Sequence, residues 1–93
     1  MKPEQVNPRN FKVIKVLYDD KQFSVAYGIW EENQKKIGLR WNGDNQDAGY
    51  PKTFGNPMWF ILSEKLTKSF LKSLLDNSNS NNLEIIRILE TLY

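Results

Sequence analysis

Residues 22–30, QFSVAYGIW, alternate between large apolar and small side chains. The large residues are Phe23, Val25, Tyr27 and Ile29, and the small ones are Ser24, Ala26 and Gly28. A period of two is the pattern of a β-strand whose two faces meet different surroundings. Because small side chains leave room above a strand, we expect another segment of the chain to approach that face closely.

Two further strand patterns flank this one. Residues 11–18, FKVIKVLY, are rich in β-branched and aromatic side chains, and residues 36–41, KIGLRW, alternate again. In the first of these segments the alternation places Ile14, Val16 and Tyr18 on one face, and Phe11, Val13 and Leu17 on the other. Short polar connections join the three segments, which predicts an antiparallel meander.

A fourth strand and two helices are expected in the second half of the chain. Residues 58–62, MWFIL, form an apolar run typical of a buried strand. Ser63 is a suitable N-cap, and after it apolar residues recur at helical spacing as far as Leu75. Asn81 and Glu84 have the spacing of a capping box, which would open a last helix at about 82–92.

These patterns predict an α+β fold. Its four-stranded antiparallel sheet, a meander plus one strand after a long loop, would be covered by two C-terminal helices. The length of 93 residues fits a single domain spanning 1–93. Residues 1–9 are polar and contain Pro3 and Pro8, so we expect them to form a flexible lead-in.

The composition excludes several classes of function. The chain has no cysteine and no histidine, which excludes disulfides, thiolate chemistry and the standard activated nucleophiles. We therefore expect no enzymatic activity, no cofactor and no metal site. The lack of disulfides, of a signal peptide and of an apolar run of 18 residues favours a cytoplasmic protein that does not enter the membrane.

Asp44 and Asp47, in NGDNQD, are the clustered carboxylates of the segment that follows the third strand. The spacing of the oxygen-bearing side chains matches a calcium loop only in part, because Thr53 stands where a bidentate glutamate is needed. Hydrogen bonds from these side chains to their own loop backbone are the favoured interpretation.

The segment from Gly38 to Phe60 holds four of the five glycines and two of the three tryptophans of the chain. Its sequence, GLRWNGDNQDAGYPKTFGNPMWF, predicts a long shaped loop packed by its own aromatic side chains. Protein-binding surfaces are enriched in Trp, Tyr and Arg. We therefore expect a small binding module that contacts another protein through this loop. Its binding residues would be Arg40, Trp41, Asn42, Tyr50 and Phe54, with the three aromatic rings as anchors.

Core positions are the other interpretation of these aromatic residues. Trp59 lies within the apolar run, so we expect it in the core. For Trp41 and Tyr50, which adjoin polar loop residues, surface and core both stay open.

Nucleic-acid binding is the alternative function. At 100° per residue, Lys65, Lys68 and Lys72 fall within an arc of about 60° on the predicted helix, so they form one stripe that could follow phosphates. Lys52 would extend the basic segment, and Arg40 with nearby aromatic rings could stack on bases. A solvated helix face is the simpler interpretation of the same stripe.

The last helix also raises the question of assembly. From Leu83 to Leu92 its apolar residues cover about 220° of the helical wheel, which exceeds the stripe of roughly 100° that one contact needs. Either the preceding helix or the same helix of a second copy would cover the surplus, so a homodimer through this helix is a further expectation.

The motif GLRWNG followed by GYPKTFGNPMWF resembles a pattern in small, uncharacterised bacterial proteins. It covers about a quarter of the chain, and it assigns no functional residue. The resemblance implies an accessory, immunity or inhibitor protein of the kind often encoded on mobile elements.

Overall fold

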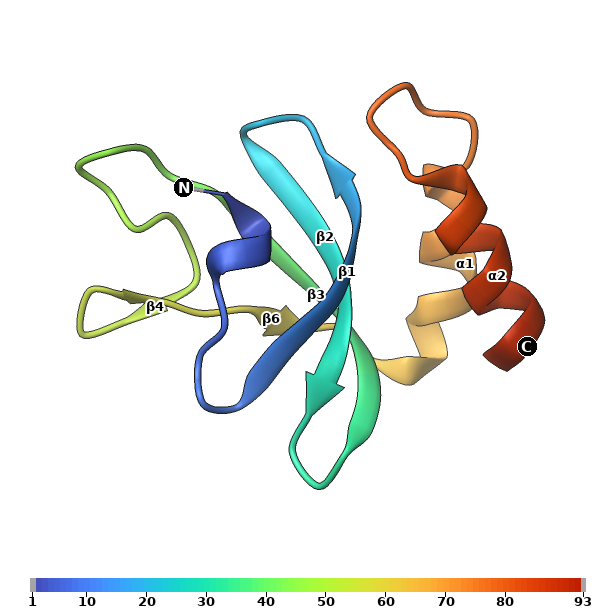
Figure 1. The fold of residues 1–93 in the computed structure, drawn as a ribbon, viewed down its shortest axis with the longest axis horizontal. Helices are drawn as coiled ribbons and strands as arrows, with labels where there is room; N and C mark the ends of the chain where they lie inside the picture. Colours follow the sequence, from blue (N-terminus) through green and yellow to red (C-terminus); the bar gives the residue numbers. More distant parts are fainter. Residues whose placement is uncertain (1, 93) are drawn as a thin grey trace.

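The predicted α+β fold is confirmed in the computed structural model, which describes residues 2–92. One antiparallel sheet has the order β1-β2-β3-β6, formed by β1 Phe11–Asp19, β2 Phe23–Trp30, β3 Gln34–Trp41 and β6 Phe60–Ile61. Two helices, α1 Glu64–Leu74 and α2 Asn82–Leu92, lie on one side of this sheet (Figure 1). Within the predicted long loop, β4 Lys52–Thr53 and β5 Asn56–Pro57 form a separate small hairpin. No helix in the described part of the chain is long and apolar enough to span a membrane.

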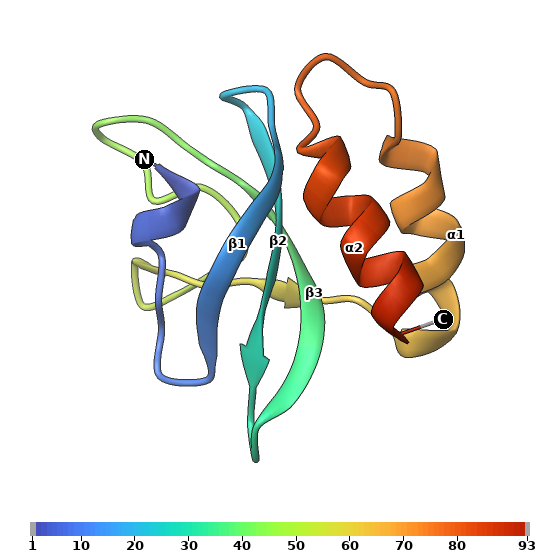
Figure 2. The ribbon, with the colours of Figure 1, turned by 45° about the vertical axis from the view of Figure 1, so that its right-hand side comes forward.

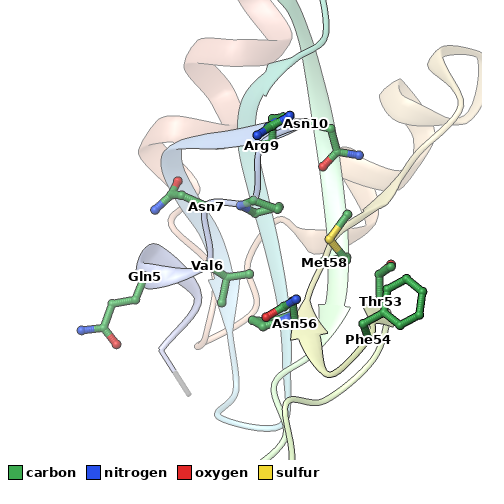
Figure 3. A pocket seen from close by; sticks show the side chains of 11 residues that line it. Gln5, Val6, Asn7, Arg9, Asn10, Thr53, Phe54, Asn56 and Met58 are labelled. Carbon is green, nitrogen blue, oxygen red and sulfur yellow. The ribbon is translucent and has the colours of Figure 1, made fainter.

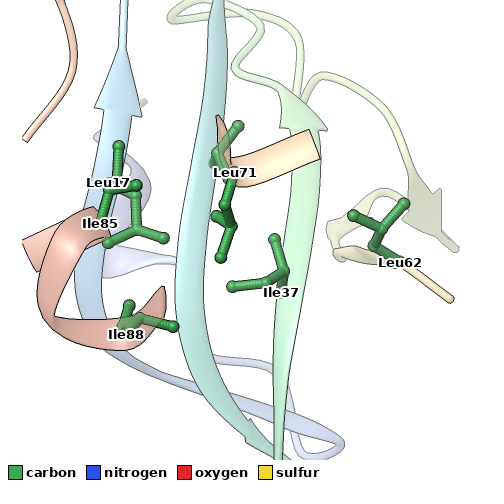
Figure 4. Packing of buried hydrophobic residues seen from close by; sticks show 7 residues of the cluster. Leu17, Ile37, Leu62, Leu71, Ile85 and Ile88 are labelled. Carbon is green, nitrogen blue, oxygen red and sulfur yellow. The ribbon is translucent and has the colours of Figure 1, made fainter. Parts of the chain in front are cut away.

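The helix side of the sheet carries the larger core. It joins residues of β1, β2 and β3 to the inner faces of α1 and α2, and Figure 4 shows these side chains meeting between the two layers. The buried members are Leu17, Val25, Ile37, Leu62, Leu71, Ile85 and Ile88. Val25 of β2 and Ile37 of β3, which lie on the large face of the alternation, thus belong to this core.

The opposite face of the sheet carries a second core, built on the small residues of β2. Val6, Phe11, Ala26 and Trp59 pack together there, and the rings of Phe11 and Trp59 lie 5.6 Å apart. A side chain at Gly28 would place its Cβ 2.5 Å from the Phe11 ring. The small face is thus occupied by aromatic rings, as close approach to that face requires.

The N-terminal residues belong to this second core, which differs from the expected flexible lead-in. Pro3–Gln5 form a short 3-10 helix, and both Pro3 and Val6 are buried. The indole Nε1 of Trp59 donates a hydrogen bond of 2.7 Å to the carbonyl of Val6. Figure 2 shows this segment on the face of the sheet away from the helices. The prolines shape the segment, and apolar burial holds it in place.

Strand β1 is irregular, and this corrects the expected sorting of its side chains. Its pairing with β2 shifts register between Val13 and Lys15 and again between Val16 and Tyr18. Phe11 and Val13 therefore contribute to the second core, whereas Leu17 contributes to the helix-side core. Each β-bulge adds one residue to a strand and so changes which face the following side chains occupy.

The outer edge of β1 is covered by segments from two distant parts of the chain. The backbone N–H of Val13 donates to the side-chain oxygen of Asn7 at 2.7 Å. Further along, the N–H of Asn81 donates to the carbonyl of Leu17 at 2.7 Å, and Asp19 N–H donates to a carbonyl of the same connection between α1 and α2.

The start of α2 agrees with the predicted cap. The Asn81 side-chain oxygen accepts the N–H of Glu84 at 3.3 Å, which is one of the two bonds of a capping box. The second bond is not formed, because the Asn81 N–H donates to the carbonyl of Leu17. Ser63 behaves differently, because its side chain makes no capping hydrogen bond at the start of α1. Its backbone carbonyl instead accepts the hydroxyl of Thr67 at 3.0 Å.

Candidate functional site

Arg40 is a buried residue whose side chain binds the backbone of the long loop. Only 1% of its surface is exposed. Its guanidinium donates hydrogen bonds to the backbone carbonyls of Ala48, Pro51 and Met58, and it lies 6.0 Å from the ring centre of Trp59. Among residues 2–92 it forms no ion pair, and burial lowers its pKa. The loop carbonyls therefore take the place of a carboxylate around this buried cation.

The burial of Arg40 corrects the expectation that Arg40 belongs to the binding surface. The alternation of β3 puts Arg40 on the face of the small residues, whereas Trp41, the next residue, lies on the other face. Asn42 is buried as well, and its side chain accepts a hydrogen bond from the Ser24 hydroxyl at 2.8 Å and donates one to Asp19 at 3.3 Å. Both residues support the loop, and neither is accessible to a partner.

Gly49 is what allows the loop to close over Arg40. Its φ of 81° lies in the left-handed region, which favours glycine. A Cβ at this position would lie 2.0 Å from the carbonyl oxygen of Trp41 and 2.6 Å from the Arg40 guanidinium. Any side chain there would push the loop away from the strand.

Trp41 and Tyr50 lie directly opposite each other at the end of the sheet. Their backbones exchange two hydrogen bonds of 2.7 and 3.0 Å, so both side chains project from the same face. The ring of Trp41 contacts Phe23 edge-on, with centroids 4.8 Å apart, while 55% of Trp41 and 67% of Tyr50 remain exposed. The sequence left open whether Trp41 and Tyr50 lie at the surface or in the core, and in the structure both lie at the surface.

Phe60 extends this surface, although the sequence did not single it out. It pairs with Leu39, two residues before Trp41, so its side chain lies on the same face and is exposed. The sequence MWFIL could have indicated the exposure of Phe60, because alternation along a strand puts Phe60 on the other face from the buried Trp59. We name the exposed side chains of Trp41, Tyr50 and Phe60 the aromatic edge.

Phe54 lies apart from the aromatic edge, at the tip of the β4–β5 hairpin. It is 99% exposed and has a φ of 50°, a conformation that an aromatic residue adopts only with strain. A groove of about 650 Å³ separates this hairpin from the N-terminal segment (Figure 3). Val6, Pro57 and Met58 are among the apolar residues that line it.

The residues predicted to bind nucleic acid are not brought together. Lys65, Lys68 and Lys72 are exposed along α1, as expected. Lys52 instead lies in the β4–β5 hairpin, where it pairs with Asp47 at 3.5 Å, and Arg40 is buried beneath the loop. The lysine stripe therefore has neither of the two basic partners that the sequence suggested.

The loop carboxylates bond to their own backbone, as predicted. Asp44 accepts the N–H of Gln46 at 2.8 Å, and Asp47 accepts that of Gly49 at 2.9 Å. The Gly49 N–H and the nearby Lys52 lower the pKa of Asp47. These carboxylates therefore fold the loop that carries Tyr50.

Comparisons with family models, with curated proteins and with solved structures found no match for this chain. The arguments for function therefore rest on which side chains are exposed, which are buried, and how their backbones are held.

Proposed function

We propose that this chain is a small non-enzymatic binding module that acts through protein–protein contact at the aromatic edge. The observation that carries the proposal is the pair formed by Trp41 and Tyr50, exposed side by side on backbones joined by two hydrogen bonds. Aromatic side chains supply large contact area, and burying them against a partner is strongly favourable.

The support beneath the aromatic edge favours binding over chance exposure. Arg40 holds the loop carbonyls, and Asn42 joins the ends of three strands through Ser24 and Asp19. A loop fixed before binding loses little conformational entropy when a partner docks. In this proposal Arg40 has a positioning role and is no longer one of the residues that contact the partner.

Phe54 is proposed as a second contact of the same loop. An exposed aromatic ring in a strained backbone contributes little to the stability of the chain itself, so we propose that Phe54 acts outside the chain. The resemblance of the 38–60 segment to small bacterial proteins supports an accessory, immunity or inhibitor role for the module.

The test is partner capture by single variants from an extract of the source cells. Trp41→Ala and Tyr50→Ala should each lose the captured protein, while their circular dichroism spectra stay native. Ile14→Ala is the matched control, because it removes an exposed apolar side chain from β1, which is the edge strand at the opposite edge of the sheet from β6. Equal capture by all three variants, or unfolding of both loop variants, would contradict the proposal.

A further inference from the structure

The groove between the N-terminal segment and the β4–β5 hairpin has walls that buried side chains hold in place (Figure 3). Val6 lines it from the N-terminal segment, and its carbonyl accepts the indole N–H of Trp59. Met58 lines it from the chain after the hairpin, and its carbonyl accepts a hydrogen bond from Arg40. A groove of about 650 Å³ that is formed before binding has the size and rigidity of a ligand site.

Several polar side chains around the groove are not used by the chain itself. Asn7 is used, because its amide donates to the carbonyl of Glu4 and accepts the N–H of Val13. The side chains of the others form no hydrogen bond or ion pair within residues 2–92, and they are Gln5, Arg9, Asn10, Thr53 and Asn56. The Oδ1 of the half-buried Asn10 is shielded from solvent and has no donor. An acceptor left in this state costs free energy that a suitable ligand would recover.

Arg9 gives the groove a single positive charge. Among the described residues that line it, none is an Asp or a Glu, and the other lining side chains are neutral. Figure 3 shows Arg9 and Asn10 at the end of the groove away from Phe54. A guanidinium pairs with a carboxylate through two parallel hydrogen bonds, so this end of the groove suits one carboxylate.

The rest of the lining is apolar and comes from both walls. Val6 and Pro8 belong to one wall, and Phe54, Pro57 and Met58 belong to the other. An apolar channel with one cation at its end fits a chain that carries apolar side chains and ends in a carboxylate. A nucleic-acid backbone would need several cations, and the groove offers one.

We propose that this groove binds the C-terminal end of an extended peptide from another protein. The α-carboxylate would pair with Arg9, and a backbone N–H of the peptide would bind Asn10 once its amide turns toward the groove. The last apolar side chains would contact Val6 and Met58. Neither Trp41 nor Tyr50 lines the groove, so the proposal does not depend on the aromatic edge.

The probes are labelled peptides of about six residues that end in valine, leucine or phenylalanine with a free carboxylate. Fluorescence anisotropy should show saturable binding of at least one of them, and amidation of its C-terminus should weaken binding about tenfold. Arg9→Gln should weaken the free-acid peptide by a similar factor and leave the amidated peptide unchanged. Arg87→Gln is the matched control on α2 and should change neither. Met58→Gln should weaken both peptides, because it removes an apolar contact that they share.

Other outcomes would overturn the proposal. Equal binding of the free-acid and amidated peptides would show that no carboxylate is recognised. Tighter binding of an amidated peptide with a glutamate in mid-chain would identify an internal acidic segment as the ligand. Binding that Trp41→Ala abolishes and Arg9→Gln leaves intact would place the peptide on the aromatic edge. Absence of saturable binding by all three free-acid peptides would show that the groove does not recognise a C-terminus.

Discussion

The guanidinium of Arg40 donates a hydrogen bond of 2.5 Å to the backbone carbonyl of Met58. This bond joins the end of β3 to the chain just before β6, so the Arg40 side chain links the two ends of the long loop. Because Tyr50 lies within that loop and pairs with Trp41, the geometry of the aromatic edge depends on a residue that a partner does not touch.

Arg40→Lys should destabilise the protein by about 2–4 kcal/mol. Lysine keeps the charge, but its single ammonium group cannot reproduce the forked donors that bind three carbonyls. Urea unfolding measures the loss. The reciprocal change Lys35→Arg, at an exposed position of the same strand, should leave the midpoint unchanged. Equal stability of Arg40→Lys and the parent would show that the guanidinium does not hold the loop.

Phe54→Asn should stabilise the protein by about 0.5–1 kcal/mol. Asparagine tolerates the left-handed conformation that Phe54 adopts. Because the Phe54 ring is almost fully exposed, removing it sacrifices almost no packing. The thermal midpoint should therefore rise. Phe60→Asn is the control, since Phe60 lies in a strand and offers no such gain. A fall in the midpoint of Phe54→Asn would place the ring in a contact that stabilises the chain.

Ile88→Glu should unfold the protein, whereas Leu83→Glu should leave it folded. Ile88 is buried in the helix-side core, so a carboxylate there would lose its hydration, which costs several kcal/mol. Leu83 is exposed on the same helix. Circular dichroism at increasing urea separates the two variants. A folded Ile88→Glu chain would mean that α2 is not needed for the core.

The expected α2 dimer interface is narrower than its apolar pattern suggested. Much of the wide apolar arc packs within the chain itself, through Ile85, Ile88 and the partly buried Leu89. The side chain of Leu92, the last member of that arc, lies outside the described residues. A homodimer therefore stays a prediction, now confined to Leu83 and Ile86.

Stability should fall in acid because of Asp20. Its carboxylate accepts the N–H of Phe23 at 2.7 Å and the hydroxyl of Tyr18 at 2.9 Å, and these bonds lower its pKa below 3.8. The contribution is full above pH 3.8 and is lost as pH falls through the lowered pKa.

Asp20→Asn should therefore lose less stability than the parent between pH 7 and pH 3. Thermal midpoints at the two pH values measure this difference. Glu31→Gln, which removes a carboxylate from the turn between β2 and β3, should behave as the parent does. An identical pH dependence of Asp20→Asn and the parent would rule out this carboxylate as the source.

Local patterns accounted for the sheet, the helices and the large face of β2. Period-two alternation predicted β2 and β3, which contribute Val25 and Ile37 to the core, and the Asn81–Glu84 spacing predicted the start of α2. Trp59 is buried as its apolar run suggested. These features depend on neighbours a few residues apart, which is what a sequence pattern records.

The support of the candidate site depends on distant residues and was missed. Arg40 is buried because carbonyls from three separate positions of the loop converge on it, and no local pattern encodes that convergence. The alternation did hold one clue, because it puts Arg40 and Trp41 on opposite faces, so they could not share one surface. The burial of Val6 likewise follows from Trp59, far along the chain.

The covered edge of β1 has a consequence for behaviour at high concentration. An open strand offers a row of unpaired amides and carbonyls, on which other chains can stack into fibrils. Here Asn7 occupies one such amide, and the connection before α2 occupies the positions near Leu17. Loosening either segment would expose a template for strand addition, so these modest polar contacts protect the protein from aggregation as well as shaping its fold.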